Sequence, residues 1–362
     1  MIFQEESQLL QHIKLGHLYR VYLLYGEEKY LKEMYEKRLI RLASPEQFEE
    51  FNFHRFDGGE LDVDAFIEAC ESLPLFAQQR CVVVEKFDFE ALSAKDKEKV
   101  TALLQDPPET TVCILVVDKE EFLPKRSAGA RKIVELCDHA GAVLELKRRS
   151  TADLTRFVRS KLEARSCAIS REDAEWLIER CEGNMLTLSG ELEKLGAYMQ
   201  SLPPSADGRP RQVTAAILEQ VTCKTVSASV YDLAKAILAD RFPKAMQIVQ
   251  DLLYLRYQPT AILAALSGAY LDLYIAKIAR ADGVGEREIK TNFSYKGRDF
   301  VVRNSLRDCQ KFPLAVLRDS VEYLAQTDYR MKSSRADNEL LLEQAVTQLF
   351  VIASQEENRR AK

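Results

Sequence analysis

Gly26 and Lys32 stand six positions apart, the spacing of the first glycine and the lysine in a phosphate-binding loop. In the pattern G-x-x-x-x-G-K-[ST], glycines let backbone N–H groups surround the phosphates, the lysine neutralises them and the hydroxyl holds Mg²⁺. Here Leu31 replaces the second glycine and Glu33 replaces the hydroxyl residue. A branched side chain would crowd the phosphates and a carboxylate would repel them. We therefore expect a degenerate loop that binds no ATP, the alternative being that this spacing arose by chance.

The other residues that could do chemistry are incomplete as well. A magnesium-binding strand usually ends in Asp-Glu, whereas the corresponding run ends in Glu85 followed by Lys86. The four histidines have no recurring nucleophile or base partner, and the eight cysteines include no Cys-x-x-Cys pair. Zinc modules and disulfide frameworks need such clustering or a secreted context. We expect no catalytic residue, no metal and no cofactor.

Residues from about 18 to 145 alternate strand-like and helical segments, which predicts an α/β domain with a parallel sheet. Two of the strand-like runs are continuously apolar, as strands buried on both faces are. The predicted strands are residues 19–25, 51–56, 81–85, 112–117 and 142–146. The predicted helices are residues 31–42, 62–71, 91–104 and 130–137.

After Ser150 the strand signal disappears and helical patterns continue to the end. Ser150 with Asp153, and Ser170 with Asp173, have the spacing of helix N-caps, and Gly183 suits a helix end. Leucines 188, 192 and 195 and Met199 recur at helical spacing. Residues 201–210 are rich in proline and other helix breakers, which predicts a linker between a small helical domain (148–210) and an all-α bundle (211–362). The predicted bundle helices are residues 230–239, 243–255, 259–280, 315–326 and 338–354, with turns at Asp282-Gly283 and Lys296-Gly297.

Composition narrows the class of protein. Hydrophobic residues make up 46% of the 362 residues and charged residues 30%, which is ordinary for a folded cytosolic protein. The net charge of −5 disfavours an extended, non-specific grip on DNA. We find neither a signal peptide at the start nor about 18 uncharged apolar residues in a row, so we expect a cytoplasmic protein that contacts no membrane.

Two surface features could bind partners. Leu73, Pro74, Leu75 and Phe76 place large apolar side chains between a helix and a strand, where they either contact a protein or pack onto the core. A basic cluster contains Lys125, Arg126, Arg131 and Lys132, and residues 147–149 form a second one. Each cluster either contacts DNA phosphates or is a solvated surface. Asp328 and Lys332 fit an i,i+4 helix pair.

Several segments in order resemble the delta subunit family of the bacterial DNA polymerase III clamp loader, from about residue 18 to residue 350. They are residues 22–28, residues 72–76 ahead of the strand 80–85, Gly183-Asn184 followed by residues 191–195, and Asp328 with Lys332. The motor subunits of such clamp loaders carry an arginine-finger motif, a lid arginine and a zinc module. This chain has Glu135–His139 and Gly183–Leu186 where the first two belong, and no zinc module.

The resemblance implies a degenerate AAA+ domain (1–147), a helical lid (148–210) and a helical collar (211–362) that oligomerises with the motor subunits and delta-prime. It implies a non-catalytic subunit of the DNA polymerase holoenzyme that binds the sliding clamp (the beta subunit) and opens its ring for loading onto primed DNA. Residues 73–76 would then contact the clamp. An active P-loop NTPase with an unusual loop and a helical DNA-binding module are the alternatives.

Overall fold

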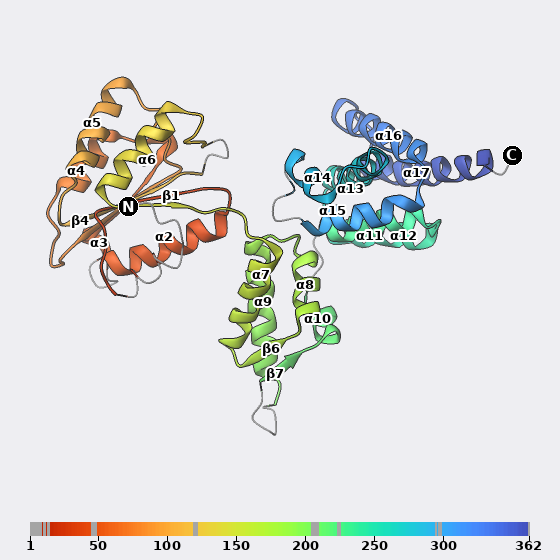
Figure 1. The fold of residues 1–362 in the computed structure, drawn as a ribbon, viewed down its shortest axis with the longest axis horizontal. Coiled ribbons are helices and arrows are strands. Elements are labelled where there is room, and N and C mark those ends of the chain that lie inside the picture. Colours follow the sequence, from red (N-terminus) through yellow and green to blue (C-terminus); the bar gives the residue numbers. More distant parts are fainter. Residues whose placement is uncertain are drawn as a thin grey trace. The chain divides into compact units, whose positions relative to one another are not determined.

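The computed structural model describes residues 15–44, 49–118, 122–203, 210–222, 226–293, 295 and 299–360, together with Leu9 and His12. The chain divides into two compact units, Met1–Arg148 and Arg149–Lys362. In Figure 1 the first unit runs from red to yellow and the second from yellow-green to blue. The predicted division into domains at 148–210 and 211–362 stays a prediction.

A five-stranded parallel sheet forms the first unit, in the order β2-β3-β4-β1-β5, which confirms the predicted α/β class. The strands are β1 (Val21–Tyr25), β2 (Phe53–Asp57), β3 (Arg80–Glu85), β4 (Thr111–Val116) and β5 (Ala142–Glu145). All six residues of β4 are buried, as its apolar run predicts.

Helices cover both faces of this sheet, with α2 on one face and α4, α5 and α6 on the other (Figure 1). Their bounds are α2 (Lys29–Ala43), α3 (Glu49–Asn52), α4 (Val63–Glu71), α5 (Ala94–Gln105) and α6 (Ala128–Ala140), with a 3₁₀ turn at Gly58–Glu60. Asp62, Ser93 and Ser127 cap α4, α5 and α6 by accepting backbone N–H bonds. The predicted start of the second strand was wrong at its first two residues, because 51–52 form the end of α3.

Parallel strands place all their carboxyl ends at one edge of the sheet and all their amino ends at the other. Gly26 follows β1, Lys86 follows β3 and Asp118 lies just beyond β4, so all three lie at the carboxyl edge. Residues 72–79 lead from α4 into β3 and therefore lie at the amino edge. The sheet thus separates the two candidate sites of this unit.

The second unit begins with α7 (Thr151–Glu163), α8 (Arg171–Arg180), α9 (Met185–Ser201) and α10 (Ala215–Val221). The predicted caps are confirmed, since Ser150 and Asp153 form a capping box, Ser170 caps α8, and Gly183 has φ +67° after α8. The apolar face of α9 is buried at all four predicted positions. Residues 204–209 of the predicted linker lie outside the described residues.

The expectation that no strand follows Ser150 was wrong. Strand β6 (Cys167–Ile169) pairs in parallel with β7 (Arg211–Val213). Each strand has only three residues, which is too short for alternation to reveal. Strand β7 follows Pro210, so along the chain the helices α8 and α9 come between the two strands of this small sheet.

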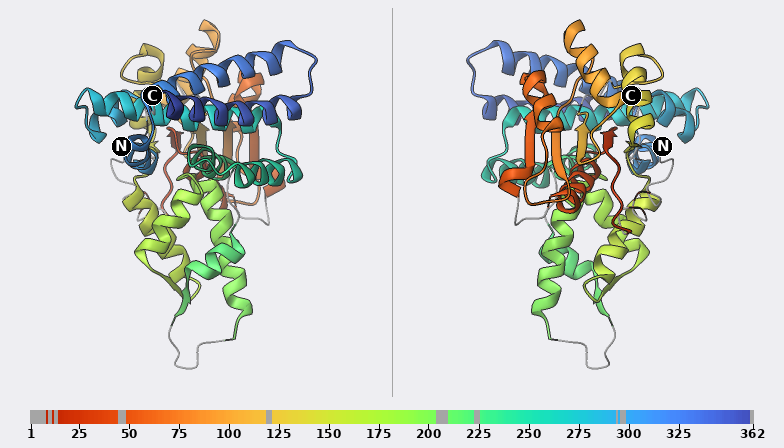
Figure 2. Two further views of the ribbon diagram at one scale, coloured as in Figure 1. Left: turned by 90° about the vertical axis from the view of Figure 1, so that its right-hand side faces the viewer. Right: turned by 90° about the vertical axis from the view of Figure 1, so that its left-hand side faces the viewer.

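A bundle of helices completes the second unit and confirms the five predicted segments. It comprises α11 (Val226–Leu238), α12 (Phe242–Tyr254), α13 (Pro259–Ala281), α14 (Glu286–Asn292), α15 (Asp299–Asp308), α16 (Leu314–Ser333) and α17 (Asn338–Arg360), with a 3₁₀ turn at Cys309–Lys311. Figure 2 shows α16 and α17 side by side. The turn at Asp282-Gly283 is present, with Gly283 at φ +72°, whereas Lys296-Gly297 lies outside the described residues.

Helix α13 is the one described helix that is long and apolar enough to cross a membrane. A single such helix is weak evidence, because central helices of folded bundles have the same composition. Here α13 packs against α11, α15, α16 and α17, and its Ile262, Leu266 and Tyr270 are fully buried in the bundle core. We therefore assign α13 to the core.

Candidate functional site

The phosphate-loop region at the carboxyl edge is closed by the protein itself. Helix α2 begins only three residues after Gly26, so Leu31 lies in its first turn and is buried. The Glu28 N–H donates to the Leu146 carbonyl at 3.0 Å, and the Leu146 N–H donates to Tyr25 at 2.7 Å. Gly26 has φ +119°, and a Cβ on it would lie 2.4 Å from the Leu146 carbonyl oxygen. The backbone of this loop therefore packs against the end of β5.

Lys32, the residue that would neutralise phosphates, is engaged inside the unit. It is 4% exposed, and its Nζ donates to the Val117 carbonyl at 2.9 Å and to Asp118 Oδ1 at 2.6 Å. Both acceptors lie beyond the end of β4. Glu33 is oriented toward Lys29, with 3.9 Å between Nζ and Oε1. The lysine is thus a buried structural cation.

The acids at the ends of β3 and β2 are paired in the same way. Glu85 accepts from Arg55, whose Nη1 also lies 3.0 Å from Glu36 Oε1. Lys86 donates to Asp57 at 2.6 Å, a hydrogen bond that lowers the pKa of Asp57 and raises that of Lys86. Burial raises the pKa of Glu36 in spite of Arg55. The acids at the ends of β2 and β3 are therefore paired with cations of the same unit, and the Lys86–Asp57 pair lies at the exposed surface.

No group of three or more histidines, cysteines or acids in the described part of the chain is placed to hold a metal ion. Seven cysteines are buried free thiols, whereas Cys223 lies outside the described residues. Burial raises the pKa of the Cys181 thiol to about 12, which makes it a poor nucleophile at neutral pH.

The amino edge of the sheet has the opposite character. Residues 72–79, which we call the apolar loop, expose Leu73 to 75%, Leu75 to 50% and Phe76 to 83%. The interpretation in which these side chains pack onto the core does not hold for them. The segment after Pro74 is not helical, since Phe76 has φ +57°, a backbone conformation that a right-handed helix excludes.

Two buried polar side chains hold the backbone of the apolar loop. Asn52 Nδ2 donates to the Leu75 carbonyl and Asn52 Oδ1 accepts from the Leu75 N–H, both at 2.7 Å. The Arg80 guanidinium donates to the carbonyls of Ala69, Phe51 and Leu73 at 3.2, 3.3 and 3.3 Å. Asn52 is 0% exposed and Arg80 is 6% exposed. The loop therefore presents apolar side chains from a fixed backbone.

The roles of Asn52 and Arg80 were not predicted from the sequence. Asn52 stood inside a predicted strand and Arg80 at the start of another, and their partners lie up to 29 residues away. One signal was available, because asparagine is disfavoured within strands and so marks a break after Phe51.

The basic cluster is only partly free for a partner. Lys132 lies over the Phe89 ring, with Nζ 5.8 Å from its centroid, and Arg131 Nε donates to the Pro124 carbonyl at 3.5 Å. Lys125 and Arg126 are exposed in the turn before α6. DNA contact by this cluster stays a prediction. Asp328 and Lys332 do form the expected i,i+4 pair, with Nζ and Oδ2 2.6 Å apart.

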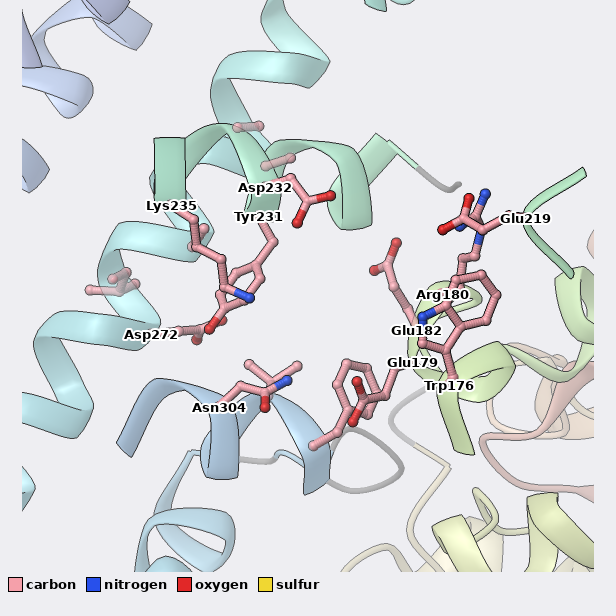
Figure 3. Close-up of a pocket in the computed structure, with 17 residues that line it drawn as sticks. Trp176, Glu179, Arg180, Glu182, Glu219, Tyr231, Asp232, Lys235, Asp272 and Asn304 are labelled. Carbon is pink, nitrogen blue, oxygen red and sulfur yellow. The ribbon is translucent and has the colours of Figure 1, made fainter. Parts of the chain in front are cut away.

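A cavity of about 590 Å³ lies in the second unit between α8, α11, α13 and α15 (Figure 3). Its wall contains Arg180, which lies 4.6 Å from the Trp176 ring centroid and donates to Glu219 and to the Thr222 carbonyl. Tyr231 on the opposite wall donates to Asp308 at 3.1 Å. These bonds join elements of the unit to one another, and none identifies a ligand.

Comparisons with known proteins agree across most of the chain. The sequence profile described as "DNA polymerase III, delta subunit" matches residues 22–138, and the one described as "DNA polymerase III delta subunit, C-terminal domain" matches residues 227–349. Together they cover more than half of the chain, and the first includes both the phosphate-loop region and the apolar loop.

Individual relatives agree with these profiles. The DNA polymerase III subunit delta of Bacillus subtilis (strain 168) is 26% identical over 345 residues, which cover 93% of this chain and 95% of the relative. The probable DNA polymerase III subunit delta of Aquifex aeolicus (strain VF5) is 23% identical, covering 83% and 84%. The solved structure of the Bacillus subtilis DNA clamp loader delta protein has a TM-score of 0.65 at 23% identity and covers 95% of this chain and 99% of that one.

Proposed function

Because the chain belongs to the DNA polymerase III delta subunit family, we propose that it binds the ring-shaped sliding clamp of the replication machinery and opens that ring for loading onto primed DNA. It acts in the cytoplasm as a non-catalytic subunit of the clamp loader. Its AAA+-like α/β domain followed by helical domains is the fold of the Bacillus subtilis clamp loader delta protein.

The observation that carries this proposal is the apolar loop. Leu73, Leu75 and Phe76 are exposed on a backbone that buried Asn52 and Arg80 hold. Burying one such side chain in a partner's pocket contributes roughly 1.5–3 kcal/mol. Aromatic and aliphatic anchors of this kind often dominate an interface.

Binding opens a ring only if the open ring is bound more tightly than the closed one. Shifting an equilibrium from 1:99 to 99:1 needs a difference of about 5.5 kcal/mol. Three apolar anchors supply free energy of that order when the pocket that accepts them is fully formed only in the open ring. The fixed backbone of the loop matters here, because a flexible loop would adapt to both states.

The carboxyl edge supports the absence of nucleotide chemistry in this chain. Lys32 is paired with Asp118, Glu85 with Arg55, and Gly26 is closed against Leu146. This disfavours the alternative of an active P-loop NTPase. ATP is then bound by other loader subunits, which this chain meets through exposed apolar side chains of its collar helices, Tyr329, Leu340 and Val351.

The test is binding of the purified full-length chain to the sliding clamp of the same source, without nucleotide. We expect Leu75→Ala/Phe76→Ala to weaken binding at least about tenfold. Tyr254→Ala/Leu255→Ala is the matched control, because this leucine and aromatic neighbour are also exposed, to 64% and 88%, but lie in the second unit. The control should bind as the parent does.

Absence of binding by the parent contradicts the proposed function. Equal losses in the two double variants contradict the site while leaving the function. A second arm records the thermal unfolding of the parent with and without Mg-ATP. A ligand at 100 times its Kd raises stability by about 2.7 kcal/mol, so any clear stabilisation favours the NTPase alternative.

A further inference from the structure

We propose that helix α3 is a working part of the clamp-binding surface, in which Asn52 positions the apolar loop and Phe51 extends the apolar area that the loop presents. This inference rests on the proposed function. Neither residue belongs to the run 73–76 that the sequence singles out, and α3 precedes that run by some twenty residues.

Asn52 is suited to fixing a backbone position. A carboxamide can donate and accept at the same time, and here it donates to the Leu75 carbonyl and accepts from the Leu75 N–H. The bonds are 2.7 Å long and the side chain is fully buried. Leu75 lies between Leu73 and Phe76, so the two hydrogen bonds from Asn52 fix the middle of the exposed segment.

The anchor itself is fixed to the sheet. Asn52 is followed directly by β2, whose Phe53 is aligned with Cys81 of β3. Strand β3 begins at Arg80, which holds the loop from its other side. Preorganising a binding segment raises affinity because less conformational entropy is lost on association. Removing the Asn52 carboxamide should therefore weaken clamp binding while leaving every apolar contact side chain in place.

Phe51 contributes differently, as a direct contact. Its carbonyl and that of Leu73 accept from the same Arg80 nitrogen, each at 3.3 Å. The two backbones therefore both lie within hydrogen-bond distance of one nitrogen of the Arg80 guanidinium. The Phe51 side chain is 50% exposed and that of Leu73 is 75% exposed. Phe51 continues the apolar surface of the loop, and the occupant that covers the loop therefore also covers Phe51.

A double-mutant cycle separates these two roles. Asn52→Ala should weaken clamp binding about fivefold or more in the parent, but less than about twofold in the Leu75→Ala/Phe76→Ala background, because it acts through those side chains. Phe51→Ala should weaken clamp binding about threefold to tenfold. This factor should be similar in the parent and in the Leu75→Ala/Phe76→Ala background. Phe293→Ala, which removes a ring exposed to 53% in the second unit, is the control.

Thermal unfolding is measured for every variant, because loss of Asn52 also lowers stability. If Asn52→Ala does not fold, Asn52→Asp replaces it, which keeps the acceptor for the Leu75 N–H and loses the donor. A purely structural role would lower Tm and leave the Kd of the folded protein unchanged, and this result overturns the positioning role. Parent-like binding by Phe51→Ala overturns the contact. Failure of the parent to bind would instead contradict the proposed function, and parent-like binding by Leu75→Ala/Phe76→Ala would contradict the proposed clamp-binding site.

Discussion

The two edges of the sheet in the first unit differ in what they leave unpaired. At the carboxyl edge Lys32, Glu85 and Lys86 each have an internal partner of opposite charge. At the amino edge Leu73 and Phe76 are exposed to solvent, while Asn52 and Arg80 bond to the backbone of the apolar loop. A surface binds a partner mainly through apolar side chains that the fold leaves exposed and through polar groups that have no hydrogen-bond or ion-pair partner within the chain. In this unit the nucleotide edge has been closed and the opposite edge has been left open.

This comparison also explains why the two edges tolerate change differently. Polar groups at the closed edge depend on one another, so removing one leaves its partner unpaired, at a cost to stability. Apolar side chains at the open edge contact little in the isolated chain, so removing them should reduce binding and leave stability unchanged. Substitutions at the closed edge should therefore change the free energy of unfolding to different extents.

The largest effect is expected for Gly26→Ala. The added Cβ would meet the Leu146 carbonyl oxygen at 2.4 Å on a residue with φ +119°. We expect a loss of roughly 2–4 kcal/mol of unfolding free energy, measured by denaturant unfolding. Gly190→Ala is the control, since nothing lies within 4 Å of a Cβ there, and it should gain about 0.5–1 kcal/mol in the α9 helix. Equal stability of Gly26→Ala and the parent would mean that the loop is not closed.

An intermediate effect is expected for Lys32→Met. It removes the bonds to Val117 and Asp118 from a side chain that is 4% exposed, and should cost about 1–3 kcal/mol. Clamp affinity should not change, because the lysine lies at the other edge. Lys29→Met, which removes only the 3.9 Å contact to Glu33, should change stability by less than about 0.5 kcal/mol. A marked loss of clamp binding by folded Lys32→Met would break the comparison.

The smallest effect concerns Glu36 and pH. Burial raises the pKa of its carboxyl above the ordinary value of 4.5, so the folded state binds this proton more readily than the unfolded state does. Its contribution to stability is therefore lost as pH rises from about 4.5 through the raised pKa. Relative to the parent, Glu36→Gln should gain stability between pH 4 and pH 7, as thermal unfolding would record. A difference that shrinks as pH rises would show that Arg55 outweighs burial.

Sequence patterns predicted the elements whose signals are local. The apolar runs of β3 and β4, the caps at Ser150 and Ser170 and the glycine after α8 each depend on neighbours a few residues apart. The pair β6 and β7 was missed because each strand has three residues and their pairing spans more than forty.

The candidate site followed the same division. Leu75 and Phe76 were singled out because their types are conspicuous at a helix-to-strand connection, but the sequence could not say whether they are exposed. Their contact with the clamp stays a prediction. Asn52 and Arg80 were missed because a buried polar residue is defined by its partner, and both partners are distant in the chain. Lys32 matched a motif, yet its pairing with Asp118 depends on two strands being neighbours.

The strand order has a consequence for how the chain is made. Strand β1 emerges first from the ribosome but lies between β4 and β5, with Tyr22 aligned with Ile114 and Ala142. At translation rates of roughly 5–20 residues per second, the roughly 90 residues from Tyr22 to Ile114 take about 5–20 s to appear. During that interval the nascent chain carries an apolar strand without neighbours. Translation that stops before β5 leaves one side of β1 permanently unpaired.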